Sequence, residues 1–121
     1  MSEQKSVMSE RSFQFAIQVV NCYRHLVAEK KEFILSKQLL RSGTSIGANI
    51  REAQNAESPA DFIHKLKIAQ KEADETIYWL ELLEATGYLP IPNFLPLKAE
   101  ASQLLKMLKS AILTTKGRVK S

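Results

Sequence analysis

Residues 39–53 read LLRSGTSIGANIREA, and this stretch decides the fold. Seven of its central eight residues, 42–49, have small side chains, and Ile46 is the exception. The flanking sequence has helical periodicity, yet each glycine within a helix costs roughly 0.5–1 kcal/mol relative to alanine. A helix that accepts this cost at Gly43 and Gly47 must recover it through packing. The stretch therefore predicts that a second helix approaches closely at these glycines.

Apolar residues recur at steps of three and four on both sides of this stretch and predict four helices. We expect helices at about residues 9–31, 34–56, 59–86 and 96–116, with flexible tails at 1–8 and 117–121. The third start is the best marked, because Ser58-Pro59-Ala60-Asp61 combines a capping serine, a first-turn proline and an acid. Long helices with short connections predict one all-α domain over residues 1–121, an antiparallel up-down-up-down four-helix bundle.

Each expected helix has an apolar stripe that should face the core. In the first helix this stripe is Phe13, Ala16, Val20, Tyr23 and Val27, and Ile17 and Leu26 widen it. The stripe of the second helix is Leu35, Leu39, Gly43, Ile46, Ile50 and Ala53. That of the third helix is Phe62, Leu66, Ala69, Ala73, Thr76, Leu80 and Leu83. That of the fourth helix is Leu97, Ala101, Leu104, Leu108, Ala111 and Thr115.

Composition excludes several classes of protein. The chain has 121 residues, 45% hydrophobic and 25% charged, which suits one folded domain with its own core. The single cysteine, Cys22, excludes an internal disulfide, and with only His25 and His64 there is no zinc-ligand set. Because no Glu-x-x-His pair occurs, a di-iron bundle is not expected either. We predict no metal and no cofactor.

The start of the chain is polar, and no window is apolar enough to span a bilayer. We therefore expect a cytoplasmic protein with no membrane partner. The balance of 17 basic against 13 acidic residues gives a net charge of +4. This mild excess permits an anionic partner without requiring one.

A polar stripe runs beside the apolar stripe of the second helix. Its members Ser42, Ser45, Asn49 and Glu52 are separated by three, four and three residues, so they share one face. One interpretation is a hydrogen-bonded network between helices or subunits, formed by Arg41, Ser42, Gly43, Ser45, Gly47, Asn49 and Glu52. The alternative is a strip that faces a ligand, in a small-ligand-binding or enzymatic bundle. Ser45 as a nucleophile would need an activating base, and no histidine lies near it in sequence. We predict no catalytic residue and no enzymatic activity.

Basic residues gather late in the chain and form a candidate nucleic-acid surface. Nucleic-acid affinity depends largely on neutralising phosphates with such side chains. An ordinary lysine-rich solvent face is the competing interpretation, and no helix-turn-helix or RNA-binding sheet motif occurs. The candidates are Lys106, Lys109, Lys116, Arg118 and Lys120, with a second group at Lys65, Lys67 and Lys71.

The stretch Gln38–Ala53 resembles the signature of the 23S ribosomal RNA intervening-sequence protein family. Asp61–Leu66, Ile68-Ala69, Glu72-Ala73 and Tyr78-Trp79-Leu80 resemble its third helix, and Leu83–Leu89 is similar to the end of that helix. The resemblance covers about residues 12–116. It implies an antiparallel four-helix bundle that assembles as a homopentameric ring or barrel, with no established catalytic residues. The family is related to the accessory variability protein of diversity-generating retroelements, which binds a reverse transcriptase and nucleic acid through a basic surface. A nucleic-acid-handling protein is thus a further expected partner.

Overall fold

The computed structural model describes residues 3–120, and the side chains of residues 7–119. Four helices make up the fold: α1 (Glu3–Ala28), α2 (Leu35–Gln54), α3 (Pro59–Ala85) and α4 (Ile91–Lys120). Residues 3–120 contain no strand, which confirms the predicted all-α class.

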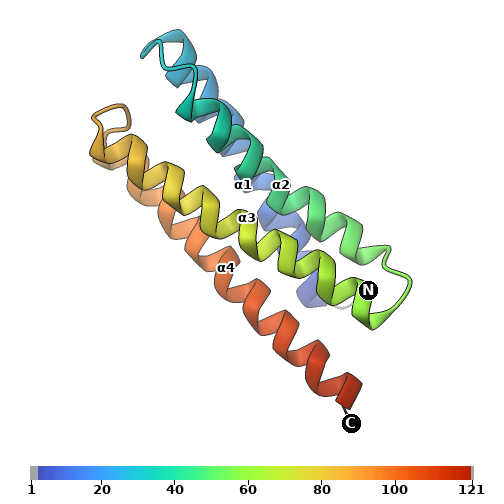
Figure 1. The fold of residues 1–121 in the computed structure, drawn as a ribbon. Coiled ribbons are helices and arrows are strands. Elements are labelled where there is room, and N and C mark those ends of the chain that lie inside the picture. The colour runs from blue at the N-terminus through green and yellow to red at the C-terminus, as the bar shows by residue number, and fades with distance from the viewer. Residues whose placement is uncertain (1–2, 121) are drawn as a thin grey trace.

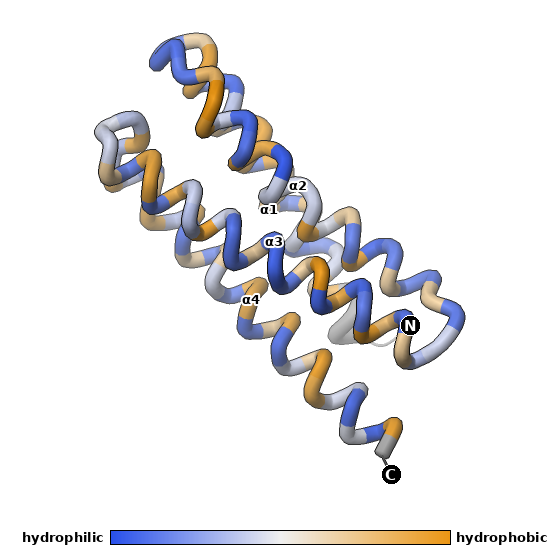
Figure 2. Tube along the Cα trace, viewed as in Figure 1, coloured by the Kyte–Doolittle hydropathy of each residue, from blue (hydrophilic) through white to orange (hydrophobic). Residues whose placement is uncertain are grey.

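The helices form a four-helix bundle (Figure 1). The α1–α2 and α3–α4 connections lie at one end, here called the loop end, and the α2–α3 connection lies at the other (Figure 1). Each helix contacts the next in the chain, and α4 also contacts α1, although α1–α4 is the least extensive of these pairs and α2–α3 the most extensive. Apolar and polar residues alternate along every helix, as amphipathic bundle helices require (Figure 2).

The predicted stripes of α2, α3 and α4 are correct. All seven stripe residues of α3 are buried, as are five of the six in α2 and five of the six in α4. The exceptions, Leu35 and Thr115, are half-buried. The start of α3 is also as predicted, because the Asp61 backbone N–H donates to the Ser58 hydroxyl over 3.1 Å and Pro59 occupies the first helical position.

The predicted core face of α1 was largely wrong. Leu26 is buried as expected, but Phe13 and Ile17 are 50% and 41% exposed, and the other members of the predicted face are half-buried. The remaining buried residues of α1 are Met8, Ser12, Phe15 and Val19. This helix is apolar on two faces, so periodicity alone could not choose between them. The face that is buried places a valine and a serine against the two glycines of α2.

Several helix boundaries also differ from expectation. Residues 3–8, expected as a tail, belong to α1, and Met8 is 1% exposed within the core. Helix α4 begins at Ile91 rather than near residue 96 and contains Pro96. Pro92, in the first turn, removes no hydrogen bond of the helix, because the first N–H groups have no partner within it, whereas Pro96, in the second turn, removes one. At the other end, residues 117–120 of the expected tail continue α4.

Helices α1 and α2 approach each other closely at Gly43. A Cβ atom added to Gly43 would lie 2.8 Å from both Cγ atoms of Val19. At Gly47 the added Cβ would lie 3.3 Å from the Ser12 hydroxyl oxygen. The helix that approaches α2 closely, as predicted, is therefore α1. Gly43 has to lack a side chain because Val19 occupies the space that its Cβ would need.

The turn between α1 and α2 is held by Glu32. Glu32 is 8% exposed, and its carboxylate accepts hydrogen bonds from the backbone N–H groups of Ile34, Leu35 and Ser36 over 3.2, 3.1 and 2.6 Å. Burial alone would raise the pKa of Glu32, but the hydrogen bonds from Ser36, Leu35 and Ile34 outweigh it and lower the pKa. Glu32 thus caps α2 as a buried anion at its positive end.

We expect Gly43→Ala to destabilise the protein by about 1–3 kcal/mol, because the methyl group overpacks against the stiff, β-branched Val19. The better helix propensity of alanine offsets only part of this loss. Urea denaturation would measure the change. Val19→Ala in the same chain should restore part of the stability. Gly117→Ala is the matched control, because nothing lies within 4 Å of its added Cβ. Equal stability of wild type and Gly43→Ala would contradict the close contact.

We expect Glu32→Ala to cost about 1–2 kcal/mol at pH 7, since three N–H groups lose a charged acceptor. A carboxylate whose pKa is lower in the folded state stabilises the fold above its unfolded pKa of about 4.3. That contribution disappears as pH falls through the lower folded pKa. Denaturation at pH 7 and at about pH 3 should show the gap between wild type and Glu32→Ala shrinking in acid. A Glu29→Ala control at the exposed neighbour should leave stability unchanged, and a gap that persists undiminished in acid would refute the ionic cap.

Candidate functional site

The polar stripe of α2 crosses to α3 at Ser42. The Ser42 and Thr76 hydroxyl groups share a hydrogen bond of 3.0 Å, and both residues are completely buried. Thr76 also donates to the carbonyl oxygen of Glu72 over 2.7 Å, so the pair is closed off within the bundle. Ser42 therefore belongs to an interhelical contact and does not face a ligand.

The next two members of the stripe bond to their own helix. The Ser45 hydroxyl donates to the Arg41 carbonyl oxygen over 2.6 Å, and the Asn49 side-chain amide donates to the Ser45 carbonyl oxygen over 2.8 Å. Such bonds to the preceding turn are common for serine and asparagine within helices. The predicted network is therefore discontinuous at these positions.

Ion pairs at the two ends of the stripe link α2 to α3. Arg41 pairs with Glu72 over 3.1 Å and with Glu75, and Lys65 pairs with Glu52 over 3.1 Å. The hydrogen bond to Glu75 is the main cause of a raised pKa at Arg41. Because these groups are largely exposed, the pairs fix the register of the two helices more than they add stability. Of the predicted network residues, Arg41, Ser42 and Glu52 thus contact α3, and Gly43 and Gly47 allow α1 to approach α2, whereas Ser45 and Asn49 bond within α2.

An apolar cleft of about 350 Å³ lies between α1 and α2. Arg51 covers its rim, with the guanidinium carbon 5.9 Å from the centre of the Phe13 ring, a cation–π arrangement. Glu52 is the one member of the polar stripe that lines it. The lining residues are Ser9, Phe13, Ala16, Thr44, Gly47, Ala48, Arg51 and Glu52.

Two further clefts contain the remaining side chains that could bind a ligand or take part in a reaction. Cys22 and His25 line a cleft of about 530 Å³ between α1 and α4. Burial raises the pKa of the Cys22 thiol to about 11, so it stays protonated and is a poor nucleophile at neutral pH. The third cleft, about 510 Å³, lies where the α2–α3 connection meets the end of α4 and includes Phe62 and Arg118. Ser42, Ser45 and Asn49 line none of these three clefts.

Within residues 3–120, no three His, Cys, Asp or Glu side chains gather as a metal-binding group. None of the four helices, over the part of the chain that is described, has the length and apolarity needed to cross a bilayer.

The predicted basic residues divide between paired and unpaired side chains. Lys67 and Lys71 on α3, and Lys106 and Lys109 on α4, are exposed and make no ion pair among the described residues. Lys65 differs, because it pairs with Glu52. Lys116 is half-buried and Arg118 exposed, and both make contacts within the bundle. The side chain of Lys120 lies outside the described residues.

The four unpaired lysines lie on adjoining helices at the same level. An ion pair of 3.0 Å between Lys98 and Glu81 sets the register of antiparallel α3 and α4. Ten residues before Glu81 on α3 is Lys71, and ten residues after Lys98 on α4 is Leu108. Because the two helices are antiparallel, Lys71 lies level with Leu108, which precedes Lys109. We call Lys67, Lys71, Lys106 and Lys109 the basic face. It could neutralise several phosphates at once.

The geometry defines a class: a helical bundle whose interior is sealed and whose candidate sites are all on its outer faces. The model of the 23S rRNA-intervening sequence protein family matches residues 4–110. The chain belongs to this family. Among solved structures it is similar to a crystal structure from Bacteroides thetaiotaomicron VPI-5482, described as a protein of unknown function from the S23 ribosomal protein family. The two are 52% identical with a TM-score of 0.89, over 90% of this chain and 97% of that chain. A search of curated proteins found no match.

Proposed function

We propose that the protein is a non-enzymatic, homo-oligomeric scaffold, a pentameric ring, that binds RNA or DNA on its basic face. The observation that carries the proposal is the second apolar face of α1. Phe13 and Ile17 are exposed on it, and Ala16 and Val20 are half-buried. In a monomer this apolar face would be exposed to water, which is unfavourable, whereas an interface between copies would bury it.

The neighbouring surface of α2 suits a helix from a second copy. Ala48 is exposed and Thr44 is half-buried, so only small side chains stand between a partner and the helix backbone. The cleft beside them offers a place for one large side chain. A heterologous contact that repeats around an axis closes into a ring. The number five comes from the resemblance to the family.

The basic face supports the nucleic-acid part of the proposal. It lies on α3 and α4, whereas the apolar face lies on α1 and α2, so self-association would leave the lysines accessible. A ring would present several copies of this face, and linked weak contacts bind more tightly than one. The absence of a sequence-reading motif points to contacts with phosphates rather than with bases.

The ligand-binding or enzymatic alternative required Ser42, Ser45, Asn49 and Glu52 to line an open cavity. Ser42 is buried against Thr76, and Ser45 and Asn49 bond to their own helix. Glu52 alone lines a cleft, and no general base stands beside it that could make that cleft a catalytic site. No observation favours this alternative over the scaffold.

Multi-angle light scattering at micromolar concentration should give about five times the chain mass of 13.7 kDa. Phe13→Asp should reduce the mass towards that of one chain with helicity unchanged, because the substituted side chain would have to be desolvated in the interface. Leu113→Asp is the matched control, since Leu113 is an exposed apolar residue of α4 and does not belong to the apolar face of α1 and α2. A wild-type chain that stays monomeric would reject the oligomer.

Electrophoretic mobility at low salt should show a shift with RNA or DNA. Lys106→Gln/Lys109→Gln should weaken binding similarly for unrelated sequences and reduce the magnitude of the salt slope by about 1.4–1.8, that is, by two phosphate contacts. Arg24→Gln, an exposed cation on α1, should leave affinity nearly unchanged. If wild type shifts neither nucleic acid, the nucleic-acid part of the proposal fails while the scaffold stands.

A further inference from the structure

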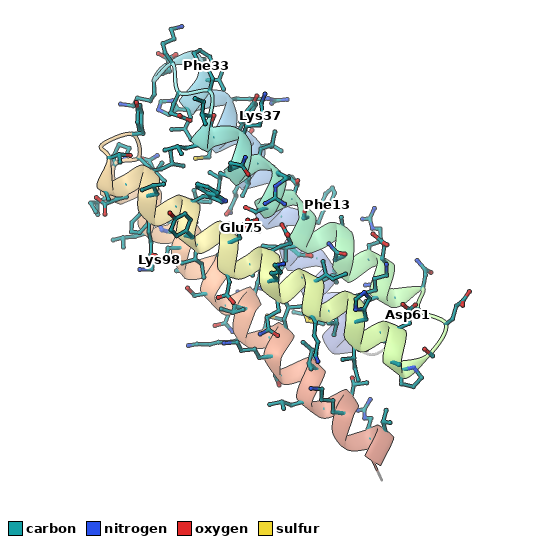
Figure 3. The ribbon with its side chains drawn as sticks, in the orientation of Figure 1. Phe13, Phe33, Lys37, Asp61, Glu75 and Lys98 are labelled. Carbon is teal, nitrogen blue, oxygen red and sulfur yellow. The ribbon has the colours of Figure 1, made fainter. Side chains whose placement is uncertain are left out.

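The loop end of the bundle carries four large apolar side chains in water. Phe33 and Ile34, in the α1–α2 connection, are 55% and 74% exposed, and Ile34 is the most exposed of all the large apolar residues described. Ile91 and Leu95, at the start of α4, are 49% and 54% exposed. Phe33 lies at the extremity of the molecule, at the opposite end from Asp61 (Figure 3). Two segments at the same end of the bundle thus expose large apolar side chains.

The α1–α2 connection is an ordered turn. Three hydrogen bonds from the backbone of residues 34–36 to the Glu32 carboxylate hold its backbone. The Ser36 hydroxyl adds a fourth bond to the Glu32 carbonyl oxygen over 2.7 Å. Ser36 is fully buried and Leu35 is half-buried, so the chain enters the core immediately after Ile34. Phe33 and Ile34 are therefore held outside by a rigid turn and need little ordering to meet a partner.

Positive charge surrounds this turn. Lys30, Lys31 and Lys37 are all exposed, and Lys37 lies beside Phe33 at the loop end (Figure 3). Among residues 29–38 the acids are Glu29, which is exposed, and Glu32, which is buried with its carboxylate hydrogen-bonded within the turn. The other connection adds no charge, because residues 85–97 contain no Asp, Glu, Lys or Arg. The loop end therefore combines exposed apolar side chains with a local excess of exposed lysines over acids.

We propose that the loop end docks on the surface of a membrane that contains anionic phospholipid. Phe33 and Ile34 enter the boundary between headgroups and acyl chains, as apolar groups of interfacial proteins do, and Ile91 and Leu95 contact the same surface. Lys30, Lys31 and Lys37 keep their ammonium groups at the level of the phosphates. This docking goes beyond the proposed scaffold function and does not depend on it.

Shape favours a lipid surface over a protein partner. The four apolar side chains come from two separate segments, the α1–α2 connection and the first two turns of α4, whereas a stable protein interface packs a continuous patch to the density of a protein interior. A lipid surface deforms around separate protrusions. The sequence-based expectation of no membrane partner considered only segments able to span a bilayer. Surface docking needs no such segment, and only the fold brings the two loops together.

Co-sedimentation with extruded vesicles tests the proposal. The full chain should bind vesicles of mixed phosphatidylcholine and phosphatidylglycerol, and bind phosphatidylcholine alone much more weakly. Phe33→Ser/Ile34→Ser should weaken binding to the anionic vesicles by at least about tenfold, since each side chain loses part of its apolar transfer. Lys30→Gln/Lys31→Gln should weaken it by roughly 25-fold, about fivefold for each lysine.

Matched controls separate docking at the loop end from general attraction. Leu113→Ser removes an exposed apolar side chain from α4, and Lys67→Gln/Lys71→Gln removes two exposed lysines from α3. Both should bind vesicles nearly as wild type does. The proposal would be overturned if the control variants lost as much vesicle binding as the loop-end variants. It would also be overturned if the wild-type protein did not bind anionic vesicles. Light scattering and mobility assays on the same samples test the scaffold separately. Circular dichroism should show all variants folded, since every substituted side chain is exposed.

Discussion

The contact between Gly43 and Val19 is the constraint on which the rest of the structure depends. With no Cβ on Gly43, α1 approaches α2 to a distance that any other residue would prevent. Val19 can occupy that space only when α1 is rotated so that Met8, Ser12, Phe15 and Leu26 also face inward. The same rotation leaves Phe13 and Ile17 outside. The exposed apolar face of α1 is therefore a consequence of the glycine in α2.

Most of the fold could be predicted from the sequence because three helices have a single apolar face. In α3 the stripe from Phe62 to Leu83 is completely buried, and even Thr76 lies where the periodicity places it. Helix α1 has two apolar faces of similar width, and periodicity measures no difference between them. The choice depends on which face fits the surface of α2, and that surface exists only in three dimensions. The start of α4 was missed for a local reason, because prolines within the first turns do not prevent a helix.

The candidate site was predicted less completely, because a shared helix face does not determine what a polar side chain bonds to. The Ser42 hydroxyl forms a hydrogen bond with Thr76 of α3, whereas the Ser45 and Asn49 side chains, on the same face, donate to backbone carbonyl oxygens of the preceding turn. Those local bonds are available to any serine or asparagine in a helix and require no partner. Membership of the family establishes the architecture, but a fold does not determine an activity. Function has to be argued from the groups that remain after the internal bonds are made.

The internal bonds determine which charges remain. Arg41, Lys65 and Lys98 hold α2, α3 and α4 in register through Glu72, Glu75, Glu52 and Glu81, and Arg11 joins α1 to α4 through Glu100 over 2.6 Å. These pairs take up five of the acids and four of the basic side chains. The lysines of the basic face and of the loop end are among the basic side chains that make no ion pair in the described part of the chain. A bundle whose core is sealed by glycine and serine contacts can act only through its surface. Here the rotation of α1 leaves an apolar face along that helix, and the ion pairs leave the unpaired lysines of the basic face on α3 and α4.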